Sequence, residues 1–136
     1  MTRRAGGQGS RLLSVGVDRP ILVVEDDDDI RYFVAAVLRD AGYSVDAAEN
    51  GAAALEQAER NPPCAILLDM RMPIMDGWEF AAQYRQRSEP AAPIIVMTAA
   101  HDAQIRAAQV NAVGVLAKPF DLEDLLAVVA GAIHRA

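Results

Sequence analysis

Residues 21–42 read ILVVEDDDDIRYFVAAVLRDAG and contain one complete strand-and-helix unit. Residues 21–25 form an apolar run of strand length that ends in acid. After it, apolar side chains recur at helical spacing as far as Gly42, the residue type expected to end a helix in a left-handed conformation. The stretch therefore predicts a buried strand followed by an amphipathic helix.

The same alternation repeats along the rest of the chain, with breaks at the prolines of residues 62–63 and 90–93. Further strands are predicted at residues 44–48, 64–68, 94–97 and 113–117. Helices are predicted from the Asn50 cap to about residue 60 and over residues 76–87, 103–110 and 121–134. Strands that are apolar on both faces and alternate with helices imply a doubly wound α/β domain, a (βα)5 parallel sheet with helices on both faces.

Length and charge set limits on the class of protein. A chain of 136 residues with 52% hydrophobic content has the size of one domain with one core. The net charge of −6 argues against a general nucleic-acid or membrane-surface binder, which needs a basic face. Residues 1–19 carry four arginines against one aspartate, so we expect a flexible leader there and a folded, strongly acidic domain over residues 20–136.

The single cysteine, Cys64, excludes an internal disulfide and any cysteine-based zinc cage. We expect it to be a small buried residue in a protein of a reducing compartment, the cytoplasm. No segment approaches transmembrane length, and the apolar stretch at residues 12–17 is too short for a signal peptide.

Chemically active side chains follow four of the five predicted strands. In doubly wound sheets, functional groups collect beyond the carboxyl ends of the strands. Glu25 and Asp26 follow the first strand, and the third, fourth and fifth deliver Asp69, Thr98 and Lys118, which is the only lysine in the chain. Helix capping is the alternative explanation for such residues, and we accept it for residues 27–29. Capping does not predict that three carboxylates, a hydroxyl and the only lysine converge.

The convergence indicates a particular chemistry. Three carboxylates held together repel one another, which raises the pKa of at least one unless a cation neutralises them. Because the ligands are hard oxygens without histidine or cysteine, Mg²⁺ is favoured. A Mg²⁺ site beside Lys118 and Thr98 suits a phosphoryl group that a carboxylate attacks in line.

Four segments carry this pattern: ILVVEDD (21–27), ILLDMRMPIMDGWEF (66–80), IIVMTA (94–99) and VLAKPF (115–120). Over residues 20–136 the chain resembles the receiver domain of two-component response regulators. The resemblance implies a flavodoxin-like sheet of order 2-1-3-4-5 and Mg²⁺-dependent transfer of a phosphoryl group from a histidine kinase or histidine phosphotransfer protein. It also implies a downstream protein target whose binding changes with phosphorylation.

The resemblance assigns roles to individual residues. Asp69 is implied as the phosphoacceptor, and Mg²⁺ would be held by Glu25, Asp26, Asp69 and the backbone carbonyl of Arg71. Thr98 would contact the phosphoryl group and Lys118 would pair with it. A cis bond is implied between Lys118 and Pro119, and Pro73 and Gly77 are implied to shape the loop after the phosphoacceptor.

The chain also departs from the family pattern. Val115 stands where receivers commonly carry an aromatic residue, so we expect no coupling between a threonine and an aromatic rotamer. The interval from Thr98 to Lys118 is shorter than in many members, which predicts a reduced fourth helix or preceding loop and a monomer or weak dimer. Arg71 and Ala100 occupy positions that, in the family, tune the attack of water on the aspartyl phosphate. The resemblance therefore does not predict the lifetime of the phosphoryl group.

Two other classes of protein share part of this pattern. A haloacid-dehalogenase-type phosphatase would use the alternating Asp26 and Asp28, but Ile30 does not fit and the chain has no room for the usual cap. A flavodoxin-like mononucleotide binder needs a phosphate loop after the first strand, where this chain has five acids. A pseudo-receiver scaffold and a receiver fragment of a larger regulator stay open. We favour a stand-alone receiver, because no output domain follows residue 136.

Overall fold

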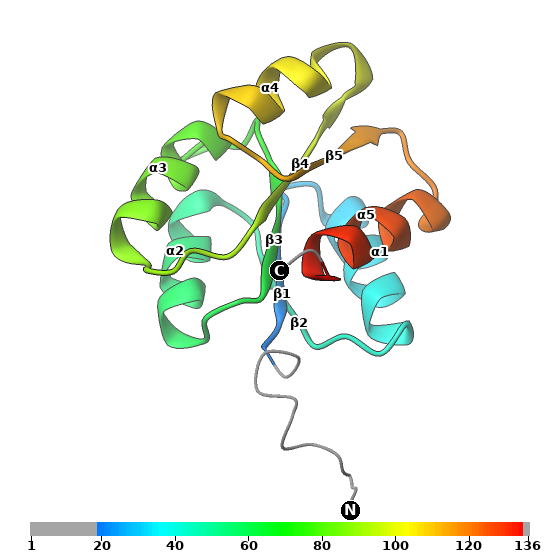
Figure 1. The fold of residues 1–136 in the computed structure, drawn as a ribbon, viewed down its shortest axis with the longest axis horizontal. Helices are drawn as coiled ribbons and strands as arrows, with labels where there is room; N and C mark the ends of the chain where they lie inside the picture. Colours follow the sequence, from blue (N-terminus) through cyan, green and yellow to red (C-terminus); the bar gives the residue numbers. More distant parts are fainter. Residues whose placement is uncertain (1–18, 135–136) are drawn as a thin grey trace, which may run out of the picture.

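The computed structural model describes residues 19–134, which form a parallel sheet with helices on both faces (Figure 1). The strand order is β2-β1-β3-β4-β5, and each neighbouring pair is parallel. The predicted doubly wound (βα)5 architecture of order 2-1-3-4-5 is therefore confirmed. Except for Arg19, the predicted leader lies outside the described residues.

The elements follow one another as β1 (Ile21–Val24), α1 (Asp28–Asp40), β2 (Val45–Ala48), α2 (Gly51–Arg60), β3 (Ala65–Asp69), α3 (Gly77–Arg87), β4 (Ile94–Ala99), α4 (Ala103–Gln109), β5 (Gly114–Lys118) and α5 (Leu122–His134). A 3-10 helix, η2 (Ala100–Asp102), joins β4 to α4. Every predicted strand and helix is present, and the ends shift by only one or two residues. α4 has seven residues and is the shortest α-helix of the described part, which agrees with the expected reduction.

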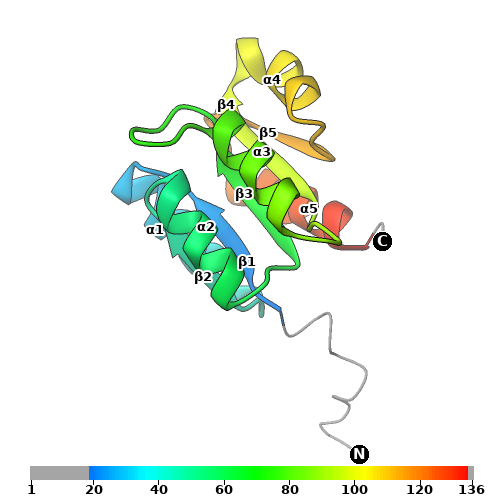
Figure 2. The ribbon, with the colours of Figure 1, turned by 90° about the vertical axis from the view of Figure 1, so that its left-hand side faces the viewer.

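The strand residues alternate between two apolar clusters, one on each face of the sheet. Leu22, Ile66 and Val96 pack under α2 and α3, whereas Val23 and Leu67 pack under α1 and α5. In Figure 1 the sheet separates the two helical layers. Figure 2 is turned so that the layer with α2 and α3 faces the viewer. Because both faces are covered, the strands are near-continuous apolar runs, and each fully buried aliphatic side chain stabilises the fold by about 2 kcal/mol.

The helix ends follow local capping rules. Asp27, Asn50 and Asp76 precede α1, α2 and α3, and each side-chain oxygen accepts a hydrogen bond from the backbone N–H three residues later. Gly42 has a φ of 103°, the left-handed conformation predicted for it after α1. The capping interpretation of Asp27 is thus confirmed. Among residues 19–134, no helix is long and apolar enough to cross a membrane.

Candidate functional site

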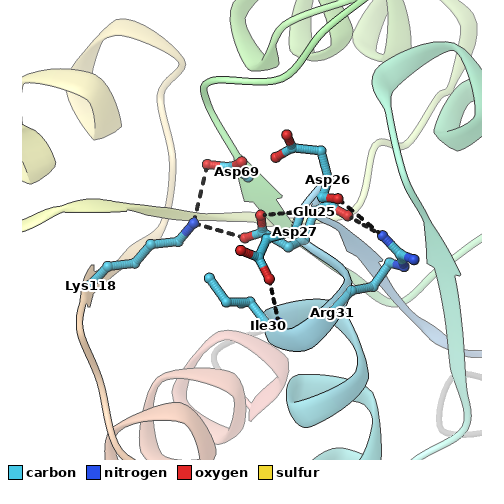
Figure 3. A network of polar contacts seen from close by, with 7 residues as sticks. All are labelled: Glu25, Asp26, Asp27, Ile30, Arg31, Asp69 and Lys118. Atoms are coloured by element: carbon cyan, nitrogen blue, oxygen red, sulfur yellow. Dashed lines mark hydrogen bonds and ion pairs between the residues drawn. The ribbon is translucent and has the colours of Figure 1, made fainter.

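The carboxyl ends of β1, β3 and β5 lie together at one end of the sheet (Figure 3). Glu25 and Asp26 follow β1, and together with Asp69 at the end of β3 they place one carboxylate oxygen each within 4.8 Å of the others. The ammonium of Lys118, at the end of β5, lies 2.8 Å from Glu25 Oε1 and 3.5 Å from Asp69 Oδ1. The convergence predicted from the sequence is therefore present.

Glu25 is the most enclosed of the three acids, with only 1% of its surface exposed. Its Oε1 accepts from Lys118, and its Oε2 accepts from the backbone N–H of Asp27 at 3.1 Å. A buried carboxylate without partners would be strongly destabilising, so these two contacts hold it in place. Asp26, in contrast, is exposed.

The pKa values of Asp69 and Lys118 both differ from their ordinary values. Burial raises the pKa of Asp69 to about 7, and the charge of Glu25 and a hydrogen bond with Asp26 act in the same direction. The positive charge of Lys118 lowers this pKa but does not offset the other effects. Burial also works to lower the pKa of Lys118, yet the hydrogen bond to Glu25 and the charge of Asp69 outweigh it, so the pKa of Lys118 is raised. The raised pKa expected from repulsion between the carboxylates is present, although burial contributes more to it than the repulsion does.

Thr98 and Arg71 complete the site. They line a hollow of about 330 Å³ together with Glu25, Asp26, Asp69 and Lys118. Thr98 is buried near the end of β4, and its neighbour Ala99 pairs with Lys118 in the register of β4 and β5. All the site residues predicted from the sequence thus line one hollow, although the side chain of Arg71 is exposed.

The loop after Asp69 depends on Gly77. A Cβ atom at Gly77 would lie 2.6 Å from Met70 Sδ and 2.8 Å from Met70 Cα, distances that no side chain tolerates. The N–H of Gly77 donates to the carbonyl of Met70 at 3.0 Å, which closes the loop onto α3. The implied cis bond between Lys118 and Pro119 is present as well.

Arg31 supports the acidic loop and was not predicted. Its side chain is buried, and Nη1 donates to the carbonyl of Glu25 at 2.9 Å and to that of Asp26 at 3.5 Å. Nη2 pairs with Asp28 (Figure 3). The available signal was its position: Arg31 lies on the same stripe of α1 as the buried Val34 and Leu38, where an apolar residue is the rule.

A second set of contacts, between α3 and α4, was also not predicted from the sequence. The indole N–H of Trp78 donates to Gln109 Oε1 at 2.7 Å. The guanidinium of Arg106 lies 5.1 Å from the Trp78 ring centroid and donates to Asp102 at 2.8 Å. Asp102 in turn lines the hollow of Asp69. This set therefore connects the rim of the site to the boundary between the two helices.

Comparison with known proteins defines the class of this fold and site. The sequence matches the response regulator receiver domain family over residues 21–130. The chain belongs to this family and is a receiver domain of two-component signal transduction, with the acidic pocket that its strand ends form. Membership implies a kinase partner.

Two curated relatives are longer than this chain. It is 41% identical over 117 residues to the DNA-binding transcriptional regulator NtrC of Escherichia coli (strain K12), an alignment that covers 85% of this chain and 25% of the relative. It is 39% identical over 117 residues to the response regulator MprA of Mycobacterium leprae (strain TN), covering 85% of this chain and 51% of that protein. The chain thus spans about a quarter and about half of the two proteins.

A solved structure of similar size supports the same fold. The chemotaxis protein CheY4 of Vibrio cholerae superposes with a TM-score of 0.74 at 34% sequence identity. The match covers 84% of this chain and 98% of CheY4. The CheY-like, flavodoxin-like fold is therefore shown along nearly the whole described part.

The acidic cluster fits a magnesium ion. Ligands on opposite sides of an octahedral Mg²⁺ lie about 4.2 Å apart. Three ligands of one ion include adjacent pairs, which lie only about 3 Å apart. The three carboxylate oxygens, now within 4.8 Å of one another, would therefore draw in when the ion binds. Their oxygens are the hard donors that Mg²⁺ prefers, and the cluster is typical of the magnesium site of receivers.

Proposed function

We propose that this chain accepts a phosphoryl group on Asp69 and signals through the resulting change in its affinity for a protein target. The observation that carries the proposal is the contact of Lys118 with both Glu25 and Asp69 inside a cluster of three carboxylates. The like charges of such a cluster repel one another, and a bound divalent cation together with Lys118 would offset both this repulsion and the added negative charge of a phosphoryl group. Membership of the receiver family supports the same chemistry.

In the transfer step, one bond to phosphorus forms and another breaks. A carboxylate oxygen of Asp69 attacks the phosphorus of a phosphohistidine on a histidine kinase or histidine phosphotransfer protein. The new O–P bond forms as the P–N bond breaks, and the electron pair stays on the imidazole nitrogen, which takes up a proton. The product is an aspartyl phosphate, a known intermediate of carboxylate nucleophiles.

The remaining residues supply charge and hydrogen bonds. Glu25, Asp26, Asp69 and the carbonyl of Arg71 would hold Mg²⁺, which supplies positive charge to the phosphoryl oxygens when it is bound. Lys118 neutralises a further oxygen, because its flexible stem already reaches Asp69. Thr98, which is buried near the end of β4, would donate a hydrogen bond from its hydroxyl to the phosphoryl group.

Incubation with Mg²⁺ and a small acyl phosphate donor, followed by intact mass measurement, tests the proposal. The wild-type chain should gain the mass of one phosphoryl group, and the Asp69→Asn variant should gain none. If the wild type gains no mass, the chain is a pseudo-receiver scaffold. Equal gain by both proteins would place the acceptor elsewhere and overturn the assignment of Asp69.

The surface beside Lys118 supports a docking position for the phosphodonor protein. Ile30 and Phe33 of α1 and Phe120 after β5 line an apolar hollow of about 430 Å³ that shares Lys118 with the acidic pocket. Phe33 is 44% exposed, and its neighbour Tyr32 is 64% exposed. Because a donor must bring its histidine to Asp69, an apolar surface next to the pocket is well placed to bind it.

Substitution of Phe33 separates docking from chemistry. The Phe33→Ala variant should accept phosphate from a small acyl phosphate at the wild-type rate but lose transfer from its histidine kinase by roughly tenfold or more. Leu122→Ala, another exposed apolar residue that lies outside this hollow, is the control. Equal transfer from the kinase to both variants would place the docking surface elsewhere.

A further inference from the structure

Arg31 makes an unusual set of contacts for a charged residue on the buried face of a helix. It is 8% exposed, and its guanidinium joins the first turn of α1 to the two residues that follow β1. One nitrogen donates to the carbonyls of Glu25 and Asp26, while the other pairs with Asp28. All three acceptors belong to the acidic run that opens α1, and none is a carboxylate of the candidate metal site.

These contacts fix the backbone from which the acidic side chains project. When a carbonyl is held, the peptide plane that contains it is held too, and this limits the direction of the neighbouring side chains. In Figure 3, Arg31 lies on the opposite side of the Glu25–Asp26 backbone from Lys118. Glu25 is therefore fixed at its backbone by Arg31 and at its carboxylate by Lys118.

We propose that Arg31 is a positioning residue for the divalent cation site, which it orders by holding the carbonyls of Glu25 and Asp26. The inference rests on the proposed phosphoacceptor function, since it assigns a role toward the same cation. Substitution of a residue that hydrogen-bonds to metal ligands and so orients them commonly lowers metal affinity by roughly ten- to a hundredfold.

Charge alone predicts the opposite effect of substitution. A guanidinium close to a cation site repels the cation, so its removal by Arg31→Met would tighten Mg²⁺ binding if only charge mattered. Arg31→Lys keeps the charge but replaces a planar fork by a single point, which cannot hold two carbonyls and Asp28 together. A positioning role therefore predicts weaker Mg²⁺ binding in both variants. An effect of charge alone predicts tighter Mg²⁺ binding in Arg31→Met and no change in Arg31→Lys.

Arg39 provides a matched control on the same helix. It also donates to a backbone carbonyl, that of Val45 at 3.1 Å, but at the far end of α1. Arg39→Lys and Arg39→Met remove the same type of contact without touching the acidic loop. A second pair, Asp28→Asn and Asp29→Asn, removes one acid each from adjacent positions of the first turn, and only Asp28 pairs with Arg31.

Mg²⁺ affinity should be measured by calorimetric titration and by the emission of Trp78, the single tryptophan. We expect the half-saturating Mg²⁺ concentration to rise about tenfold or more in Arg31→Lys and Arg31→Met, and to stay within about twofold of the wild type in both Arg39 variants. Asp28→Asn should weaken binding more than Asp29→Asn. At saturating Mg²⁺, Arg31→Lys should be phosphorylated to the wild-type extent, because Asp69 and Lys118 are intact.

Two results would overturn the inference. The first is wild-type or tighter Mg²⁺ binding in Arg31→Lys, a variant that keeps the charge. The second is weakening in the Arg39 variants of the same size as in the Arg31 variants, which would indicate a general loss of helix stability. A wild-type chain that binds no Mg²⁺ would instead contradict the proposed function itself, so the two failures are distinguishable.

Discussion

The ammonium of Lys118 lies closer to Glu25 than to Asp69, at 2.8 Å against 3.5 Å. In the unphosphorylated chain this lysine is therefore bound first to the buried acid and only second to the candidate phosphoacceptor. Both oxygens lie within reach of one flexible stem, so a phosphoryl group on Asp69 can draw the ammonium toward itself without a movement of β5.

Substitution of Lys118 by arginine tests the need for this flexible stem. Arg at position 118 keeps the positive charge, but its planar fork is larger and is matched to two acceptors at once. We expect Lys118→Arg to slow phosphorylation by a small acyl phosphate roughly tenfold or more, because a preorganised positive group at the transferring oxygens is misplaced. The phosphorylated fraction is followed by intact mass against time. A wild-type rate would show that a compact ammonium is not required, while leaving the role of Asp69 intact.

Stability without Mg²⁺ should depend on the titration of Asp69. Its pKa in the folded chain is raised from 3.8 to about 7, so the folded state binds the proton more tightly than the unfolded state. The resulting stabilisation is fully present below about pH 4 and is lost as the pH rises through about 7. Urea unfolding should show a loss on the order of 1–3 kcal/mol across this range relative to Asp69→Asn. Excess Mg²⁺ should reduce the loss, whereas parallel pH profiles for the two proteins would contradict the assignment.

Two glycine substitutions should change stability in opposite directions. Gly77→Ala would force Met70 and the loop behind Asp69 to move, because the new Cβ would lie 2.6 Å from Met70 Sδ. A loss of about 1–3 kcal/mol in the free energy of unfolding is expected. Gly131→Ala, within α5, meets no atom within 4 Å and should stabilise the chain by about 0.5–1 kcal/mol. Equal effects in urea unfolding would refute the close approach at Gly77.

Arg106 should be nearly dispensable for stability although it is buried. Its Nε and Nη1 have no hydrogen-bond partner, and the burial of unpaired donors costs about 1–3 kcal/mol. This cost offsets the ion pair with the partly exposed Asp102 and the contact with Trp78. We therefore expect Arg106→Met to change the free energy of unfolding by less than about 1 kcal/mol.

Arg85 is the control for this comparison. It lies on α3 and donates to the carbonyls of Val110 and Asn111 at the end of α4. Because Arg85→Met leaves these acceptors without their donor, it should lower the free energy of unfolding by about 1–2 kcal/mol. A larger loss in Arg106→Met than in Arg85→Met would show that the Arg106 contacts are strongly stabilising.

The strands, the helices and the grouping of the acids could be predicted because they depend on short-range patterns and one topological rule. Apolar runs ended by proline, glycine or acid delimit each element, and parallel strands bring their carboxyl ends to one edge. Glu25, Asp69 and Lys118 could therefore be grouped without knowledge of any distance between them.

The remaining contacts could not be predicted, because they depend on the angle of a helix or on the reach of a side chain. The apolar spacing of α1 predicts which aliphatic side chains face the core, but it does not show that the charged Arg31 is buried among them. Trp78 meets Gln109 across 31 residues of sequence, a contact set by the packing of α3 against α4. Cys64 was expected to be buried and is half-buried, at the position just before β3 begins.

The contact between Glu25 and Lys118 joins residues 93 positions apart in the chain, and β5 lies at the edge of the sheet. Until that last strand is added, a growing or partly folded chain carries the acidic residues of β1 and β3 without the lysine that bridges them. If Asp69 accepts a phosphoryl group as proposed, this competence would require the final strand to be in place. Because of this long separation, a chain that has not yet added β5 lacks the ammonium that the proposed phosphorylation requires.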